Sequence, residues 1–316
     1  MKTTDAIEGN EMMILEHYGI NPSKKHTTCP LCEGKAKFRI SHYQGKVMYI
    51  CTCSQGSILD LIISFTRRTF QEVVQEIDKL LGNVFEPTVK YAKEKTKQLE
   101  KKKWQLDYLR TLTSIHDTPG QAYLRKRGIY AAVGSGVGWD QKQSCIVAYS
   151  KSSLTNQISH IHQTFIKNID GNWIKDFRPT KEGALIDKKM VTVTDFVKSP
   201  AVQLFRHSDI LGIAEGLETA LSAHEMYKLP MWAALNASLL SGFIAPSGVK
   251  VLRIYADNDA NGTGMAAAYK AGRANILSKR INDVQTVEIY RPQQRGDFND
   301  VLCLAQKVVL VDTLSR

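Results

Sequence analysis

The chain has 316 residues, 43% of them hydrophobic, which is enough for two or three globular domains. No apolar run approaches the roughly 18 residues that span a bilayer, and the polar first ten residues lack the apolar core of a signal peptide. We therefore expect a cytoplasmic protein that has no membrane partner. Lys and Arg number 42 against 31 Asp and Glu, a formal net charge of +11 that favours a polyanionic partner such as nucleic acid. Many soluble proteins are also basic, so charge alone does not decide this.

Four of the six cysteines lie close together near the N-terminus, in two pairs: Cys29 with Cys32, and Cys51 with Cys53. Clustered cysteines in a cytoplasmic chain indicate a metal rather than disulfides, and a Cys-x2-Cys turn presents two thiolates at tetrahedral spacing. We expect a structural Zn²⁺ held by these four residues. The second pair is one residue shorter than usual, so His26 remains an alternative to Cys53 as the fourth ligand.

The segments around the cysteines predict a small zinc-binding domain over residues 1–86. Two strand-like segments lie between the cysteine pairs and form a hairpin over residues 36–50. After the second pair, Ser57 is placed to cap a helix, and apolar residues recur at helical spacing over residues 70–81. These helices are expected to pack on the hairpin.

A linker is predicted over residues 87–104, because seven lysines and two glutamates lie between Lys90 and Lys103. Such a charge run favours a solvated, partly helical tether.

A mixed α+β segment is predicted over residues 105–206. It begins with two helical patterns and continues with strand-like stretches. The helices are expected near residues 106–112 and 117–129, and the strands at residues 144–149, 160–165 and 173–177.

Residues 207–316 show a regular alternation of strand and helix patterns. Strands are expected at residues 211–214, 231–235, 249–256 and 284–290, and helices at residues 218–226, 238–243, 264–279 and 299–306. This alternation predicts a parallel sheet that is covered by helices on both faces.

Acidic residues follow the predicted elements of this last domain. They are Glu215, Asp257, Asp259, Asp297 and Asp300. Ligands bind at the carboxyl ends of the strands in open α/β sheets, and carboxylates are the ligands that Mg²⁺ prefers beside substrate phosphates. We expect these five residues to hold catalytic Mg²⁺ or Mn²⁺. Glu218 lies one helical turn after Glu215 and is expected to support it. Gly262 and Gly264 would leave backbone N–H groups for phosphate.

Three motifs in these acidic segments resemble the Toprim domain of primases, topoisomerases and some nucleases. They are Glu-Gly-x-Glu-Thr-Ala-Leu from Glu215, Ala-Asp-Asn-Asp-Ala-x-Gly-x-Gly from Ala256, and Gly-Asp-Phe-Asn-Asp from Gly296. The cysteine module followed by Gly-Ser-Ile-Leu-Asp-Leu-Ile resembles the zinc ribbon of bacterial and phage DNA primases. Together they imply a DNA primase, a nucleotidyltransferase with Glu215, Asp257 and Asp259 as catalytic residues.

The resemblance also implies partners and binding residues. A primase of this type binds a single-stranded DNA template and nucleoside triphosphates. The ribbon would contact the template through Lys37, Arg39 and Tyr43, and the middle segment would grip template or nucleotide through basic residues. The candidates there are Arg125, Arg127, Arg178 and Lys181. No P-loop motif is present, so a separate helicase is the expected partner, and a short phage or mobile-element form is favoured.

The expected architecture is therefore α+β and multidomain, with a zinc ribbon, a mixed middle segment and a C-terminal α/β Toprim domain. Two other functions remain open at this point. One is a Toprim nuclease or strand-breaking enzyme, and the other is a non-catalytic DNA-binding protein of replication initiation. A topoisomerase would need a nucleophilic tyrosine in a separate domain, and no such domain is evident.

Overall fold

The computed structural model describes residues 2–23, 25–43, 46–83, 89–134, 136–194 and 197–316, with only the backbone of Tyr43 and residues 89–98. It divides into two compact units. The first comprises Met1–Lys103 with Leu277–Asp283, and the second Trp104–Ile276 with Val284–Arg316. None of the helices in the described ranges is long and apolar enough to cross a membrane. The boundaries predicted at residues 86, 104 and 206 stay predictions.

The first unit is built on a three-stranded antiparallel sheet, in the order β1-β2-β3. Its elements are α1 (Thr3–Ile7), α2 (Glu11–His17), β1 (Arg39–Tyr43), β2 (Lys46–Ile50), β3 (Gln55–Ser57), α3 (Ile58–Thr66) and α4 (Phe70–Leu80). Ser57 caps α3 as predicted, in a capping box with Asp60. Apolar residues of α2, α3 and α4 are fully buried, among them Ile14, Leu61 and Ile77. The hairpin and helices predicted here are present, while the short β3 was not predicted.

Helix α5 (Val89–Arg110) covers most of the segment predicted as a linker. Its backbone is helical from Val89 onward, which agrees with a partly helical segment. Residues 84–88 and the side chains of residues 89–98 lie outside the described part of the chain.

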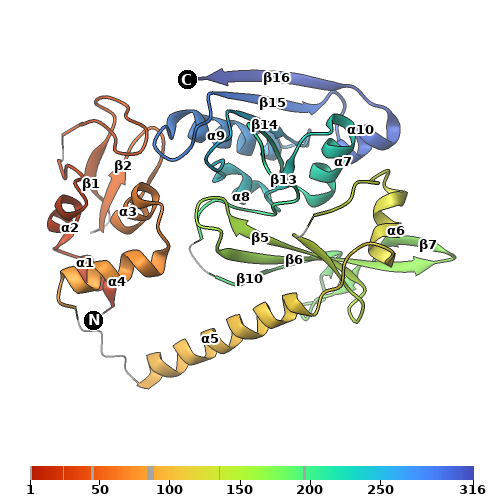
Figure 1. Ribbon diagram of the computed structural model, residues 1–316, viewed down its shortest axis with the longest axis horizontal. Helices are drawn as coiled ribbons and strands as arrows, with labels where there is room; N and C mark the ends of the chain where they lie inside the picture. The colour runs from red at the N-terminus through yellow and green to blue at the C-terminus, as the bar shows by residue number, and fades with distance from the viewer. Residues whose placement is uncertain (1, 24, 44–45, 84–88, 135, 195–196) are drawn as a thin grey trace. The chain divides into compact units, whose positions relative to one another are not determined.

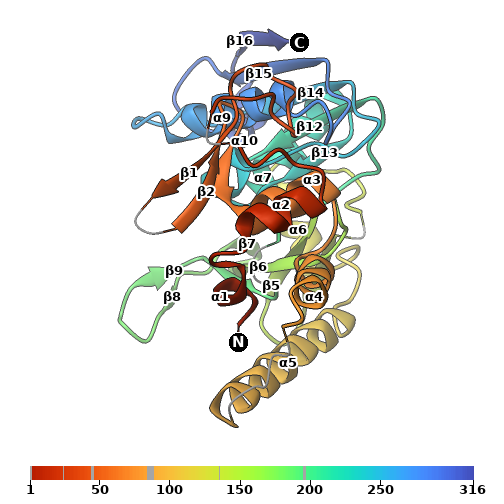
Figure 2. The ribbon, with the colours of Figure 1, turned by 90° about the vertical axis from the view of Figure 1, so that its left-hand side faces the viewer.

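The second unit begins with α6 (Pro119–Lys126) and a six-stranded antiparallel sheet. The sheet has the order β10-β6-β5-β11, with β4 on β5 and β7 on β6. Its strands are β4 (Val137–Asp140), β5 (Cys145–Ser152), β6 (Ile158–Ile169), β7 (Asn172–Lys175), β10 (Lys188–Thr192) and β11 (Pro200–Ala201). A separate hairpin of β8 (Arg178–Pro179) and β9 (Leu185–Ile186) projects from this unit (Figure 2).

A five-stranded sheet in the order β13-β12-β14-β15-β16 completes the second unit (Figure 1). Its strands are β12 (Ile210–Ala214), β13 (Met231–Ala233), β14 (Val251–Tyr255), β15 (Thr286–Pro292) and β16 (Val308–Ser315). The first four are parallel, as predicted, but β16 pairs antiparallel with β15. The expectation of a purely parallel sheet was therefore wrong at this edge, because the chain returns directly along β15 and needs no crossover helix.

Helices cover both faces of this sheet, as the alternation predicted. They are α7 (Leu217–Tyr227), α8 (Ala237–Ser241), α9 (Thr263–Leu277) and α10 (Phe298–Leu304). Ala214 and Tyr255 share one apolar cluster with residues of α7 and α10, and Ile213 and Ile254 share another with residues of α8 and α9. The first cluster also contains residues of α6 and β4, so the middle segment and this sheet are built on one continuous core.

Gly212 on β12 is required by close packing. A Cβ atom there would lie 2.0 Å from Met231 Sδ and 2.8 Å from Leu229 Cδ1. Met231 is fully buried and cannot swing away. We expect Gly212→Ala to lower the free energy of unfolding by about 1–3 kcal/mol, measured by urea denaturation. Gly242→Ala is the control, since its nearest contact would be 3.8 Å away; equal stability of the two variants would contradict the argument.

Candidate active site and metal centre

The four clustered cysteines meet in the first unit. Their sulfur atoms all lie within 4.8 Å of one another, and Cys29, Cys32 and Cys51 are buried. The Sγ atoms of Cys29 and Cys53 are 3.7 Å apart, as are those of Cys32 and Cys51. A disulfide would need about 2.05 Å. Four sulfurs at about 2.3 Å from a tetrahedral Zn²⁺ would be separated by about 3.8 Å, so the observed spacing fits zinc.

His26 is not part of this cluster. Its Nδ1 lies 3.1 Å from the carbonyl oxygen of Ala36, on the strand-like segment that precedes β1. The alternative that His26 replaces Cys53 therefore receives no support, and the thiolate set is closed. A closed four-ligand site is typical of a structural zinc, because a catalytic zinc keeps one position for water or substrate.

The acidic residues of the second unit gather at the carboxyl edge of the parallel strands. Glu215 directly follows β12, and Asp257 follows β14 after one residue. A backbone bridge between Asn258 and Gly296 then ties the loop after β14 to the loop before α10, with N–O distances of 2.9 and 3.2 Å. The side-chain amide of Asn258 adds a hydrogen bond to the carbonyl oxygen of Gln294 at 2.9 Å. This bridge brings Asp297 to the residues that follow β14.

Asp257 is the electrostatic centre of this edge. Burial raises the pKa of its carboxyl to about 7, and the charges of Asp297 and Glu215 raise it further within that value. Thr219 of α7 opposes the rise by donating to Asp257 Oδ1 at 3.4 Å. Burial and then the charge of Asp259 also raise the pKa of Glu215. Carboxylates that resist ionisation together need a cation beside them, so this edge fits a divalent metal.

The remaining carboxylates are held by backbone N–H groups. Asp259 accepts a hydrogen bond from the N–H of Gly264 at 3.1 Å, so that N–H serves the carboxylate rather than remaining open for phosphate. Asp297 caps α10 through Oδ1, which accepts from Asn299 and Asp300, and Asp300 Oδ2 accepts from the N–H of Asp297. These bonds fix the carboxylates in place before any ligand binds.

The carboxylates do not form a closed cage. In the described ranges, the cysteines are the only group of three or more metal-ligating side chains with all ligand atoms within 4.8 Å. The donor set nevertheless fits Mg²⁺ or Mn²⁺, because Mg²⁺ usually binds through one or two carboxylates and completes its shell with water and substrate phosphates.

Glu218 has a different place from the one predicted. It is buried, and its Oε2 lies 2.9 Å from Nη2 of Arg127 on the far side of α7 from Glu215's backbone turn in sequence. Tyr123 of α6 donates to Glu218 Oε1 at 3.0 Å. Glu218 therefore links the Toprim-like sheet to the middle segment, and no hydrogen bond joins it to Glu215 among the described contacts.

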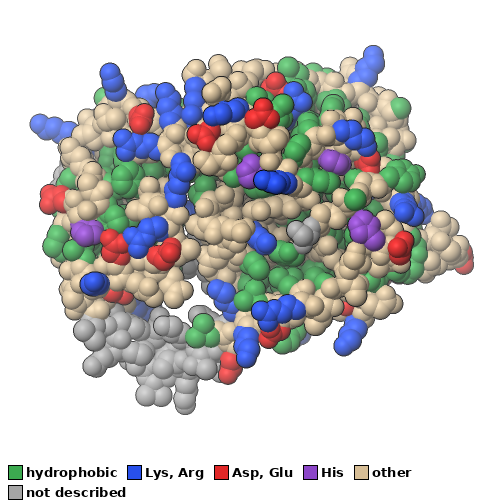
Figure 3. All heavy atoms as spheres, in the orientation of Figure 1, with side chains coloured by type: hydrophobic (Ala, Val, Ile, Leu, Met, Phe, Trp, Pro, Cys, Tyr) green, Lys and Arg blue, Asp and Glu red, His purple; other side chains and the backbone are tan. Residues whose placement is uncertain are grey.

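The predicted nucleic-acid-binding residues have varied surroundings. Arg125 and Lys181 are exposed, as is Lys37 in the first unit, where Arg39 is half-buried. Arg178 is committed to other groups: Nε donates to Asp176 at 2.6 Å, Nη2 donates to the carbonyl of Gln143, and the guanidinium lies over the ring of Phe165. The side chain of Tyr43 lies outside the described residues. On the face drawn in Figure 3, basic side chains are spread among acidic and apolar ones rather than gathered in one patch.

Lys188 is a candidate that sequence reasoning missed. It lies on β10, opposite Thr164 of β6, and its charge lowers the pKa of both Glu215 and His162. Burial is the main reason that the pKa of His162 falls to about 4. Lys188 thus brings a positive charge from the middle sheet to the acidic edge. The only signal in the sequence is the pair Lys188-Lys189 in a strand-like stretch.

Two family models match this chain. A model of the Toprim domain matches residues 210–307, and a model of the zinc-binding domain of primase-helicase matches residues 24–59. The predicted combination of a primase zinc ribbon with a Toprim domain is thereby confirmed, and so is the α+β architecture with a mostly parallel C-terminal sheet. No curated protein sequence matches the chain significantly.

Solved primase structures are similar to this chain at low identity. The zinc-binding and RNA polymerase domains of the Aquifex aeolicus primase match at 14% identity and TM-score 0.36, covering 98% of this chain and 86% of that one. A DNA primase domain from Pseudomonas aeruginosa matches at 10% and 0.38, covering 66% and 75%. The primase fragment of the bacteriophage T7 primase-helicase protein matches at 13% and 0.36, covering 58% and 65%.

Proposed function

We propose that this protein is a DNA primase, which synthesises short oligonucleotides on single-stranded DNA by metal-dependent nucleotidyl transfer. The observation that carries the proposal is the acidic edge around Asp257, joined in one chain to a primase-type zinc ribbon. Neither feature alone is specific. Toprim carboxylates also serve strand-breaking enzymes, and zinc ribbons occur in many proteins, but their combination favours primer synthesis.

The reaction joins the 3′-hydroxyl of one nucleotide to the α-phosphate of the next and releases pyrophosphate. Asp257, Asp259 and Asp297 would hold Mg²⁺ or Mn²⁺, with Asp300 as a further ligand. When bound, such a cation neutralises phosphate charge and makes the hydroxyl more acidic. Lys188 is placed to add positive charge beside Glu215, where the triphosphate would approach.

Glu215 is the residue that we assign as general base. A general base works best when its pKa lies near the operating pH, and burial together with Asp259 raises the pKa of Glu215 above its usual range. Its carboxylate would take the proton of the attacking hydroxyl. The backbone N–H of Ala237 and Lys188 limit the rise, so the group stays able to ionise at neutral pH.

The zinc ribbon is proposed to contact the template strand. Lys37 is exposed and Arg39 half-buried on the segment leading into β1, which suits contacts to phosphate. Arg125 and Lys181, exposed in the second unit, are further candidates for the template, and nucleoside triphosphates and a separate helicase complete the proposed partners. Arg127 and Arg178 already have protein partners, so their proposed part is to shape the site.

Primer synthesis on single-stranded templates tests the proposal directly. Purified protein with labelled nucleoside triphosphates and Mg²⁺ or Mn²⁺ should give short oligonucleotides. The variant Asp257→Ala/Asp259→Ala should lose them by about a thousandfold, since several kcal/mol of charge stabilisation depends on the metal. Cutting of the DNA in place of synthesis would instead identify a Toprim nuclease. Template binding without either product, on varied templates and with helicase added, would identify a non-catalytic replication protein.

A further inference from the structure

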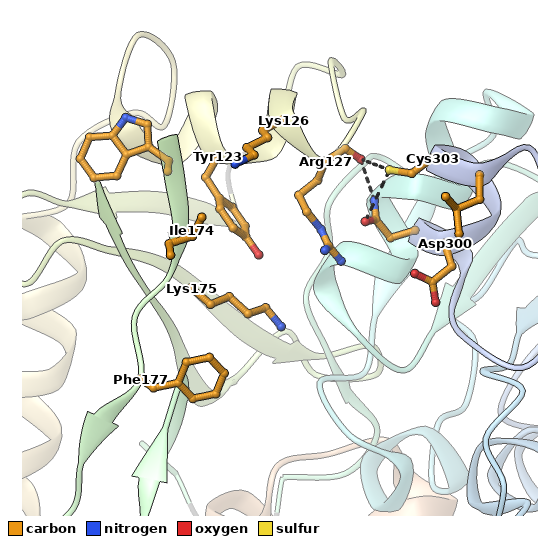
Figure 4. Close-up of a pocket in the computed structure, with 11 residues that line it drawn as sticks. Tyr123, Lys126, Arg127, Ile174, Lys175, Phe177, Asp300 and Cys303 are labelled. Carbon is orange, nitrogen blue, oxygen red and sulfur yellow. Dashed lines mark hydrogen bonds between the residues drawn. The ribbon is translucent and has the colours of Figure 1, made fainter. Parts of the chain in front are cut away.

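A cleft of about 490 Å³ lies in the second unit, beside the acidic edge. One wall is formed by α6 and α10, and the other by β7 and the residues that follow it. Figure 4 shows Lys175 and Phe177 on one side, directed across the cleft toward Arg127 and Asp300. Among these lining residues, Arg127 alone belongs to the predicted binding set.

The cleft carries more positive than negative charge. Lys126, Arg127 and Lys175 line it, against the single carboxylate of Asp300. Each cation is held in place: Lys126 by Asn172 at 3.3 Å, Arg127 by Glu218 at 2.9 Å, and Lys175 by Asp187 at 3.1 Å. Held cations lose little freedom when an anion binds, so the cleft suits a phosphate group.

A buried polar atom at this cleft also points to a ligand. Nε of Arg127 is buried and has no hydrogen-bond partner within the described ranges. A buried N–H without an acceptor is costly, and an acceptor supplied by a ligand would satisfy it.

The opposite wall supplies an apolar surface. The ring of Phe177 is 56% exposed, although the residue lines a cavity rather than a loop tip. Aromatic rings beside cations are the common surface for unpaired nucleotides, because every base offers a flat face for stacking. Asn299, the amide side chain in this cleft, already donates to Arg127 and Ser222. The cleft therefore favours stacking over readout of base edges.

The cleft also starts at the proposed reaction centre. Asp300 lines it and accepts a hydrogen bond from the backbone of Asp297, which belongs to the acidic edge. A nucleotide in the cleft would thus lie next to the group that reacts.

We propose that this cleft binds one nucleotide unit, with its base stacked on Phe177 and its phosphate between Lys126 and Lys175. The proposal rests on the proposed function and names a binding site within it. The nucleotide unit has two possible sources of the same chemistry, an incoming nucleoside triphosphate or one position of a single-stranded DNA.

Binding measurements that do not depend on catalysis test the cleft. The dissociation constant of a fluorescent single-stranded oligonucleotide would be measured by anisotropy, and that of a labelled nucleoside triphosphate by equilibrium dialysis. The variants are Phe177→Ala, Phe177→Tyr, which keeps the ring, and Leu185→Ala as a matched control. Leu185 is 65% exposed on β9 and does not line the cleft. Lys126→Gln is compared with Lys142→Gln, an exposed lysine outside the cleft.

Phe177→Ala should weaken one of the two ligands about tenfold or more, as expected for loss of one base–ring stack. Phe177→Tyr and Leu185→Ala should bind as wild type, and Lys126→Gln should weaken the same ligand as Phe177→Ala does. An effect on the oligonucleotide alone assigns the cleft to the strand, and an effect on the triphosphate alone assigns it to the incoming nucleotide. Unchanged binding of both ligands by Phe177→Ala, or an equal loss in Leu185→Ala, overturns the proposal. Wild-type protein that binds nucleotide in the cleft but makes no primer would refute the proposed function and leave the cleft intact.

Discussion

Replacing Asp257 by Asn is expected to abolish primer synthesis and, at the same time, to stabilise the metal-free protein at pH 8. The activity is lost because the amide cannot hold a divalent cation as a carboxylate does. The stability rises because the native protein at this pH must keep a buried carboxylate charged beside Glu215 and Asp297. The two effects have one cause, since the same charge cluster that binds the metal strains the fold without it.

The direction with pH follows from the raised pKa. The folded protein binds the proton of Asp257 up to about pH 7, whereas an unfolded Asp releases it near 3.8. The stability that this proton gives is present below 3.8 and is lost as the pH rises through 7. Each tenfold change in proton affinity is worth about 1.4 kcal/mol, so the cost at pH 8 is at most about 4 kcal/mol.

Urea unfolding at pH 5 and pH 8 measures this effect. The advantage of Asp257→Asn over wild type should grow between the two pH values and shrink when Mg²⁺ is added to wild type. Asp259→Asn is the matched control, because Asp259 is exposed; it should lose activity with little gain in stability. An Asp257→Asn protein that is less stable than wild type at pH 8 would show that this carboxylate is not buried against like charges.

Removing the zinc is expected to unfold the ribbon and to stop synthesis that begins on a bare template. Structural zinc contributes roughly 10–16 kcal/mol in small zinc modules at pH 7, far more than the apolar residues of such a module supply. Cys32→Ser removes a buried ligand from the cluster and should lower zinc content and stability together. Extension of a primer already annealed to the template should persist, because the acidic edge belongs to the other compact unit.

Zinc content, limited proteolysis and the two synthesis reactions would be measured side by side. Cys303→Ser is the control, since Cys303 is exposed and outside the sulfur cluster. It should keep its zinc and both reactions. Full zinc content in Cys32→Ser, or protection of the ribbon from protease after chelation, would contradict a structural role for the metal.

The sequence by itself determined the features that depend on local order. The cysteine spacing predicted the zinc site, and Ser57 with Asp60 three residues later predicted the start of α3, because capping and knuckle geometry extend over a few residues. Carboxylates that follow β12 and β14 had to share one edge once those strands were parallel, so the place of Glu215 and Asp257 was also predictable.

The tertiary structure alone decided which distant groups meet. The bridge between Asn258 and Gly296, and the ion pair of Arg127 with Glu218, join residues that no spacing rule connects. Strand β16 was missed because its burial does not alternate cleanly on an exposed edge, so the sequence carries no period-2 signal there. Lys188 and the cleft at Phe177 also depend on how the middle sheet packs against the Toprim domain, since packing between remote elements is set by the shared core rather than by local pattern.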